Sequence, residues 1–341
     1  MRVSATANLD RLIRALPKAE LHVHLEGSLT PRTLLSLADR HRLDNVPRTL
    51  QDLKRWYEFR DFAHFIEVYE TAVQALRDPE DFALLAAQTG RSLAAQGVRY
   101  AEITWTPFIH LSRGIPADVV FTGYELGRHQ AERETGIRLR WILDFPGHYG
   151  TQVGHDTLDA ALTADCDAVI GFGVGGLEVN RTPFAEVFTR ARAAGLHSVP
   201  HAGETSGPES VWVALDELDA DRVGHGINSV DDPALLARLA ADQVPLEVCP
   251  TSNLQTRAVS SLAEHPIRRL QQAGIPITIA SDDPPMFNTT LVDEYHVAAQ
   301  LLGLDAAGVA ELARTSIRVS FLPDAEQRPL LEEIDTVLAQ N

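Results

Sequence analysis

The sequence has very little lysine and cysteine. Lys18 and Lys54 are the only lysines among 30 basic residues in a chain of 341, and Cys166 and Cys249 are its only cysteines. Two distant cysteines without a C-x-x-C spacing exclude a disulfide framework and argue against a cysteine zinc site. Because no lysine follows Lys54, the sequence also excludes a metal pair bridged by a modified lysine from the middle of a sheet.

Basic residues are also few relative to acidic ones. The chain carries 47 acidic residues and a net charge of −17, whereas binding to nucleic acid draws on clustered basic side chains. No apolar run is long enough to span a membrane. Residues 1–16 predict a short amphipathic helix and not a signal peptide. We therefore expect a cytoplasmic protein that binds neither nucleic acid nor membranes; the sequence leaves its oligomeric state unknown.

Strand patterns alternate with helical patterns from end to end of the chain. Eight runs predict strands: residues 20–25, 98–105, 139–145, 168–174, 197–201, 222–226, 245–248 and 276–281. Helical periodicity appears between them, for example in residues 116–133, 183–194, 233–241 and 265–273. Eight strands separated by helices predict an α/β fold, the (β/α)8 TIM barrel. An open doubly wound sheet is the alternative, but the first strand lacks the glycine-rich turn that this fold needs.

One connection in this pattern is unusually long. No strand pattern occurs between residues 28 and 97, where helical patterns fill the space. We expect a single domain over residues 1–341, with residues 28–97 as a helical insertion after the first strand. Because long insertions over a barrel mouth often act as lids, residues 56–74 are a candidate cover for the site. A helical insertion without such a role is the alternative.

Metal-binding residue types gather where the predicted strands end. His22 and His24 lie two apart in the first strand and therefore point the same way. His201 ends the fifth strand, and Asp282 follows the eighth. Three imidazoles and one carboxylate suit a single zinc ion with water in the remaining position, although iron or manganese can use the same ligands. Structural histidines bonded to backbone and a helix-capping aspartate are the alternatives.

Two further residues fit metal-assisted hydrolysis. Glu204 follows His201 by three residues, and a carboxylic acid there can carry a proton over the cavity. A charge at the start of the next helix is its alternative role. His225 lies between two glycines at the end of the sixth strand and can reach a metal-bound water as a base or electrostatic partner. A histidine satisfied by backbone in the core is the alternative.

Five motifs carry a family resemblance. In chain order they are LPKAELHVHLEGS, HAGE, GHGI, CPTSNLQT and SDDPPMF. Over residues 16–316 the chain resembles the adenosine deaminase family of zinc aminohydrolases. The resemblance implies a (β/α)8 barrel that hydrolyses a 6-aminopurine to the 6-oxo purine and ammonia. It implies one zinc ion per chain, with the ligands His22, His24, His201 and Asp282.

The resemblance also implies roles toward the substrate. Glu204 would protonate the ring nitrogen beside the reacting carbon, and His225 would orient and help to deprotonate the zinc-bound water. Asp283 would bond the ring nitrogen on the imidazole side. The backbone N–H of Gly176 in GVGGLE would contact another purine nitrogen. Two aromatic residues of the insertion would lie over the nucleoside: Phe62 and Phe65.

The chain departs from typical adenosine deaminases on the sugar side. It reads HLEG, so Glu26 stands where an aspartate usually meets the ribose hydroxyl. The segment GVGGLE replaces the usual LAGDE-like stretch, and Trp105 stands where relatives commonly have a basic or small residue. Relatives with HLEG include enzymes acting on free adenine and on 6-aminodeoxyfutalosine, which has a bulky 5′ extension. CPTSN favours a nucleoside over free adenine, whose deaminases more often read CPLSN.

We therefore expect a purine nucleoside aminohydrolase whose partner is a small-molecule purine. Adenosine or a 5′-modified adenosine such as 6-aminodeoxyfutalosine ranks first, and free adenine second. A catalytically silent barrel that only binds is a rival from another class, as is a different amidohydrolase such as a phosphotriesterase. The presence of all four ligands together with Glu204 and His225 argues against the silent barrel. Glu204 beside a purine-orienting Asp283 argues against the other amidohydrolase, whose chemistry does not need this pair.

Overall fold

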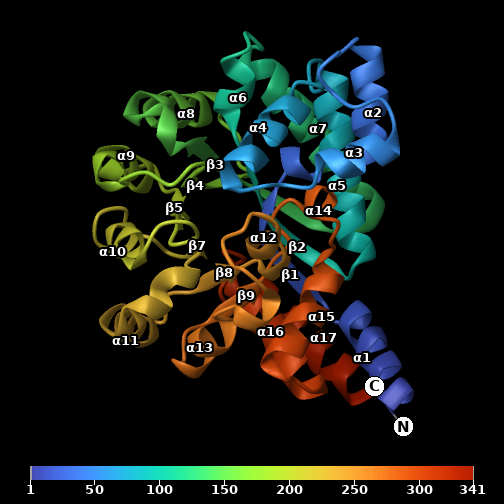
Figure 1. Ribbon diagram of the computed structural model, residues 1–341, viewed down its shortest axis with the longest axis vertical. Helices are drawn as coiled ribbons and strands as arrows, with labels where there is room; N and C mark the ends of the chain where they lie inside the picture. Colours follow the sequence, from blue (N-terminus) through green and yellow to red (C-terminus); the bar gives the residue numbers. More distant parts are fainter. Residues whose placement is uncertain (1, 341) are drawn as a thin grey trace.

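The strands of the fold pair only in parallel across the described chain (Figure 1). The computed structural model describes residues 2–340, with side chains from residue 8 onward. The strands are β1 (Lys18–His24), β2 (Val98–Trp105), β3 (Arg138–Pro146), β4 (Val169–Gly175), β5 (His197–Ser198), β6 (His201–Ala202), β7 (Val223–His225), β8 (Leu246–Val248) and β9 (Ile277–Ile279). They pair in chain order as β1 to β5 and as β6 to β9. The predicted parallel α/β fold is confirmed.

The predicted strand at residues 197–201 appears as the two short strands β5 and β6. Pro200 lies between them and has no backbone N–H to give to the sheet. The ladder nevertheless continues across the break. Val199 N–H donates to Phe172 O of β4 (3.0 Å), and Pro200 O accepts from Gly224 N–H of β7 (3.0 Å). The two strands therefore fill one place in the sheet.

The last strand also meets the first one. Val23 of β1 forms a parallel bridge with Asp282, just beyond β9. His24 N–H donates to Asp282 O (2.8 Å), and Asp282 N–H donates to His22 O (3.0 Å). The strand pairing thus runs round a ring, as in a (β/α)8 barrel. The bridge also brings Asp282 next to His22 and His24, because these two histidines flank Val23 on β1.

Helices surround the strands (Figure 1). They are α1 (Arg2–Ala15), α2 (Pro31–Arg40), α3 (Leu50–Trp56), α4 (Phe62–Val73), α5 (Pro79–Ala95), α6 (Pro107–Leu111), α7 (Ala117–Thr135), α8 (Thr151–Ala164), α9 (Ala185–Ala193), α10 (Pro208–Asp216), α11 (Pro233–Asp242), α12 (Pro250–Gln255), α13 (Ile267–Gln272), α14 (Pro284–Phe287), α15 (Leu291–Leu302), α16 (Ala306–Arg318) and α17 (Asp324–Gln340), with the 3₁₀ turns η1 (Glu26–Ser28), η2 (Gly147–Tyr149), η3 (Thr182–Phe184), η4 (Ile227–Asp231) and η5 (Leu262–Glu264). Helix α16 packs on β1 and β9 and so covers the closure of the ring. No described helix is long and apolar enough to span a membrane.

Residues 28–97 contain the helices α2 to α5, and no strand occurs in this part of the described chain. Side-chain caps define their starts: Thr30, Thr49 and Asp61 accept backbone N–H groups of α2, α3 and α4. Helix α4 buries an apolar face that includes Phe65 and Val68. Side chains of α4 also border the pocket described in the next subsection. Its action as a moving lid stays a prediction.

Candidate active site

A pocket opens at the carboxyl ends of the strands, where the sequence predicts the site. It holds about 590 Å³ of space between protein atoms, its open mouth included, which is the size of a small-molecule site. Most predicted site residues line it: His24, Phe62, Phe65, Gly176, His201, Glu204, His225, Asp282 and Asp283. His22 lies immediately behind this surface, with its ring 5.5 Å from that of His24.

The four predicted metal ligands converge on one point. His24 Nε2 and His201 Nε2 lie 3.2 Å apart, and Asp282 Oδ1 lies 3.4 Å from His24 Nε2 and 3.6 Å from His22 Nε2. His22 Nε2 is buried and has no hydrogen-bond partner among the described residues. Three ring nitrogens and one carboxylate oxygen that face each other without other partners fit a zinc ion. His22 also belongs to two buried groups of possible metal ligands, one with His201 and His225 and one with Cys249 and Asp282.

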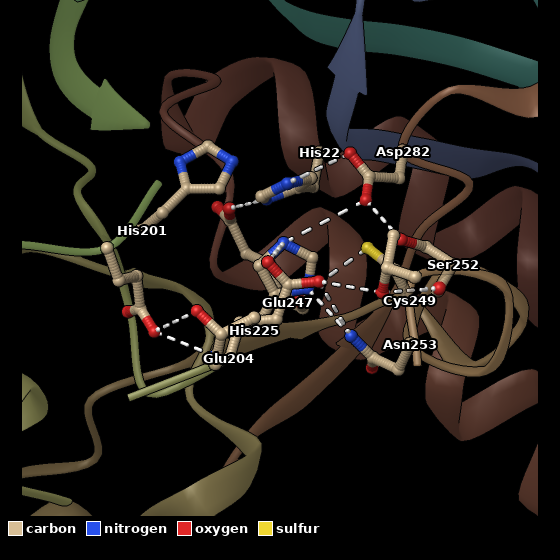
Figure 2. A network of polar contacts seen from close by, with 12 residues as sticks. His22, His201, Glu204, His225, Glu247, Cys249, Ser252, Asn253 and Asp282 are labelled. Atoms are coloured by element: carbon tan, nitrogen blue, oxygen red, sulfur yellow. Dashed lines mark hydrogen bonds and ion pairs between the residues drawn. The ribbon is translucent and has the colours of Figure 1, made fainter. Parts of the chain in front are cut away.

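Buried charges beneath the pocket hold His22 (Figure 2). Glu247 Oε2 accepts from His22 Nδ1–H at 2.8 Å, so the other ring nitrogen, Nε2, faces the ligand cluster. Arg222 donates from Nε to Glu247 Oε1 (2.6 Å) and pairs on its other side with Glu102. Burial alone would raise the pKa of Glu247, but the Arg222 and His22 charges hold it below its usual range. Glu247 therefore stays ionised, as a histidine-orienting carboxylate must.

Glu204 and His225 face the same space as the ligands. His225 Nε2 lies 3.6 Å from Glu204 Oε2 and 3.8 Å from Asp282 Oδ2. Burial, helped by the charge of Asp282, raises the pKa of Glu204 well above its usual value. Burial lowers the pKa of His225 to about 3. Both shifts favour the uncharged forms: a carboxyl group that can donate a proton, beside a neutral imidazole.

Asp283 is a buried carboxyl group beside the ligand Asp282. Burial and the Asp282 charge raise the pKa of Asp283 well above its usual range, which favours the protonated form that can donate. Its Oδ1 has no hydrogen-bond partner within the described part of the chain. A side chain at Gly27 would collide with this carboxyl group, at 1.6 Å from Asp283 Oδ1. The glycine of HLEG is thus needed for the close approach of η1 to Asp283.

Two residues at the site have left-handed backbone conformations. His225 and Asp282 both have φ of 61°, a region that non-glycine residues seldom enter. His225 is the last residue of β7, Asp282 follows the end of β9 by three residues, and both line the pocket. Such strain at two functional positions is typical of sites whose geometry the surrounding structure imposes.

The structure places Glu26 behind the pocket wall. Its Oε1 accepts from His110 Nε2 (2.8 Å), Tyr124 OH (3.2 Å) and Thr106 N–H (3.3 Å), and its Oε2 accepts from Tyr69 OH (3.4 Å). Tyr69 and Thr106 line the pocket, so Glu26 reaches it through them. A direct contact of Glu26 with ribose stays a prediction.

Gly176 and Trp105 occupy different surroundings. Gly176 lines the pocket with a φ of 70°, and a side chain there would lie 3.0 Å from His148 Nδ1. Trp105 is fully buried and packs against the rings of Phe121 and Tyr124. Trp105 therefore belongs to the core between β2 and α7.

Sequence reasoning missed several residues of the site. Asp144, at the end of β3, lines the pocket and accepts from Thr106 Oγ1 at 2.5 Å. A carboxylate at a strand end is the signal that identified Asp282, and it applied equally here. Glu178 accepts from Thr205 N–H (2.7 Å) and Ser206 N–H (2.5 Å) and so holds the loop that follows Glu204. No spacing in the sequence indicated that contact.

Known proteins resemble this chain over nearly its full length. The sequence profile of the adenosine deaminase family matches residues 17–337. An aminodeoxyfutalosine deaminase of Streptomyces coelicolor is 49% identical over 338 residues, covering 97% of this chain and 87% of the relative. An adenine deaminase structure from Arthrobacter aurescens superposes with a TM-score of 0.92 at 33% identity, over 95% of this chain and 100% of that one.

A further solved structure bears on the metal. An amidohydrolase from Burkholderia ambifaria with bound Zn superposes with a TM-score of 0.88 at 27% identity, over 97% of this chain and 95% of that one. The motifs, the parallel α/β fold, the converging histidines and these relatives agree. The chain belongs to the adenosine deaminase family.

Proposed function

We propose that this protein is a zinc-dependent aminohydrolase of 6-aminopurine nucleosides, with a 5′-modified adenosine such as aminodeoxyfutalosine as its preferred substrate. The observation that carries the proposal is the pair Glu204 and Asp283. Both carboxyl groups are buried, have raised pKa values and line the pocket that the ligand cluster borders. Two proton-carrying carboxyl groups beside a metal site suit the nitrogen-rich edge of a purine. The relative at 49% identity supports the substrate ranking.

The ligand cluster would hold one zinc ion through His22, His24, His201 and Asp282. When bound, such an ion lowers the pKa of a coordinated water from about 15.7 toward 7 and so supplies a nucleophile at neutral pH. Aromatic rings resist addition, and Glu204 removes this resistance by delivering its proton to the ring nitrogen beside the amino-bearing carbon. Its raised pKa keeps that proton available at neutral pH.

Two further groups would hold the base in register. Asp283, protonated by the same reasoning, donates to a ring nitrogen on the imidazole side. The backbone N–H of Gly176, which lines the pocket, would contact another purine nitrogen. With Glu204 on a third nitrogen, the purine is fixed at three points, and its amino group faces the metal ligands.

The lining of the pocket favours a substituted nucleoside. Its apolar residues include Phe62, Phe65, Ile66, Ile109 and Pro146. Asp144 and Thr106 add polar groups to the same lining. Free adenine would leave much of this space unfilled, whereas a sugar with an extended 5′ group would cover it. Deamination of free adenine is the second candidate, favoured by the likeness to the Arthrobacter aurescens adenine deaminase.

The test is a set of four substrates offered to zinc-loaded protein: aminodeoxyfutalosine, adenosine, deoxyadenosine and adenine. The loss of the 6-amino group is followed by ultraviolet absorbance and expressed as kcat/KM. We expect aminodeoxyfutalosine to give the highest value and adenine the lowest. A highest value for adenine would replace the proposed substrate. No turnover of any of the four would overturn the aminohydrolase itself.

A further inference from the structure

A row of hydrogen bonds reaches His225 from outside the pocket. Ile267 N–H donates to His265 Nδ1 at 3.1 Å. His265 Nε2 lies 3.1 Å from Asn253 Oδ1, and Asn253 Nδ2 lies 3.2 Å from His225 Nδ1. Figure 2 shows the amide of Asn253 beside His225. All four residues are buried, so solvent does not compete for these groups.

The direction of every bond in this row follows from its first member. A backbone N–H can only donate, so His265 Nδ1 must be an unprotonated acceptor. Burial lowers the pKa of His265 to about 4, so the neutral ring carries its single proton on Nε2. That proton goes to Asn253 Oδ1, which can only accept. The amide is thereby fixed with its nitrogen toward His225.

The last bond then sets the proton on His225. Asn253 Nδ2 can only donate, so His225 Nδ1 is the acceptor. An imidazole whose Nδ1 accepts a hydrogen bond carries its proton on Nε2. We propose that Asn253 and His265 are positioning residues that fix His225 as the Nε2–H tautomer, a hydrogen-bond donor into the active site.

This tautomer defines what His225 does in the reaction. Its Nε2 faces the space between Glu204 Oε2 and Asp282 Oδ2, at 3.6 and 3.8 Å. A donor there holds the attacking water through its oxygen and does not accept the proton that the water releases. The proton passes to a carboxylate facing the same space, Asp282 or Glu204 once it has protonated the ring. This catalytic consequence rests on the proposed function, whereas the tautomer itself does not.

Nitrogen NMR of the zinc-loaded protein labelled with ¹⁵N-histidine reads the tautomer directly. We expect a His225 Nε2 resonance with a bound proton and an unprotonated Nδ1. Asn253→Asp keeps the shape of the side chain but replaces the donor with an acceptor. We expect this variant to move the proton of His225 to Nδ1 and to lower kcat by at least about 100-fold. An unprotonated Nε2 in the unchanged protein would overturn the proposal, as would a tautomer that Asn253→Asp leaves in place.

A pair of variants at His265 separates the hydrogen bond from packing. His265→Gln keeps an N–H donor near the position of Nε2, whereas His265→Leu keeps bulk without a donor. We expect the glutamine variant to retain the Nε2–H tautomer and kcat within about 10-fold, and the leucine variant to lose the single tautomer. Melting temperatures show whether both fold. Equal His225 spectra in two folded variants would contradict a positioning role for His265. Absence of deamination with intact spectra would count against the proposed function alone.

Discussion

His22 and Glu247 are joined by a 2.8 Å hydrogen bond beneath the predicted metal ligands. The bond commits Nδ1 of the ring to the carboxylate and leaves Nε2 for the metal. Glu247 is itself held by Arg222, whose other side pairs with Glu102. A buried row of alternating charges therefore extends from the ligand cluster across the bottom of the pocket.

We expect Glu247→Gln to weaken zinc binding by about 10–100-fold, because the neutral amide no longer raises the basicity of His22. Competition with a chromophoric chelator measures the zinc affinity. Glu102→Gln is the matched control, since it changes a carboxylate on the same Arg222 that does not touch a predicted ligand. Unchanged zinc affinity in Glu247→Gln, or an equal loss in both variants, would contradict the role assigned to Glu247.

Glu204→Gln should bind zinc and fold normally but lose about 100- to 10,000-fold in kcat, because an amide has no acidic proton to give to the ring. Metal analysis and a melting curve establish the first part, and a deamination assay the second. Glu217→Gln, an exposed change beyond α10, serves as the control. Full turnover by Glu204→Gln would end its assignment as proton donor.

The pH dependence should report the same proton. The active form of Glu204 is protonated. We therefore expect kcat/KM to have its full value below the pKa of Glu204 and to fall as the pH rises through that pKa. Burial, the Asp282 charge and the Glu178 charge all raise this pKa. Glu178→Gln removes one of those charges, so the alkaline fall should begin at a lower pH than in the unchanged protein. A fall that stays in place, or that matches Glu186→Gln on the surface of α9, would contradict this coupling.

Asp144→Asn should affect nucleosides more than free adenine. One oxygen of Asp144 accepts from Thr106, and the other has no hydrogen-bond partner among the described residues, although the side chain lines the pocket. A sugar hydroxyl is a suitable donor for that oxygen. We expect a loss of about 10-fold or more in kcat/KM for adenosine-type substrates and little change for adenine, which has no hydroxyl. Equal losses on both would place Asp144 in the metal site instead.

Glu26→Asp should change selectivity without removing activity. The glutamate side chain of Glu26 accepts from four donors, two of which belong to the pocket residues Tyr69 and Thr106. An aspartate is too short to hold all four, so the sugar-side wall loses its fixed positions. The ratio of kcat/KM for aminodeoxyfutalosine to that for adenosine measures the effect. An unchanged ratio would show that the glutamate of HLEG does not set selectivity.

Much of the fold could be predicted because strand signals are local. Residues 98–105 match β2 at both ends, since this run is rich in β-branched and aromatic residues and is bounded by Gly97 and Pro107. The predicted strand at residues 197–201 is divided in the structure, because Pro200 interrupts the ladder while neighbouring strands keep its place. The insertion offered no such pattern, and its helices start at side-chain caps such as Asp61.

The residues of the candidate site could be predicted where they lie in or just after predicted strands. His22 and His24 share a face of one strand, and Asp282 meets that strand through a backbone bridge. The supporting residues could not be predicted in the same way. Glu247 contacts His22 across 225 positions of sequence, and His265 acts on His225 only through Asn253. Such contacts depend on how distant strands and loops pack, which no spacing within one segment encodes.

We expect one zinc ion, bound in this pocket, to make the chain an aminohydrolase of a 5′-extended adenosine. The most direct measurement adds zinc stepwise to metal-free protein and records the ammonia released from aminodeoxyfutalosine. We predict that the rate rises in proportion to added zinc and levels off at one ion per chain, with one ammonia formed for each nucleoside consumed. Full activity without metal, or no ammonia from a chain that holds one zinc ion, would contradict a zinc-dependent aminohydrolase.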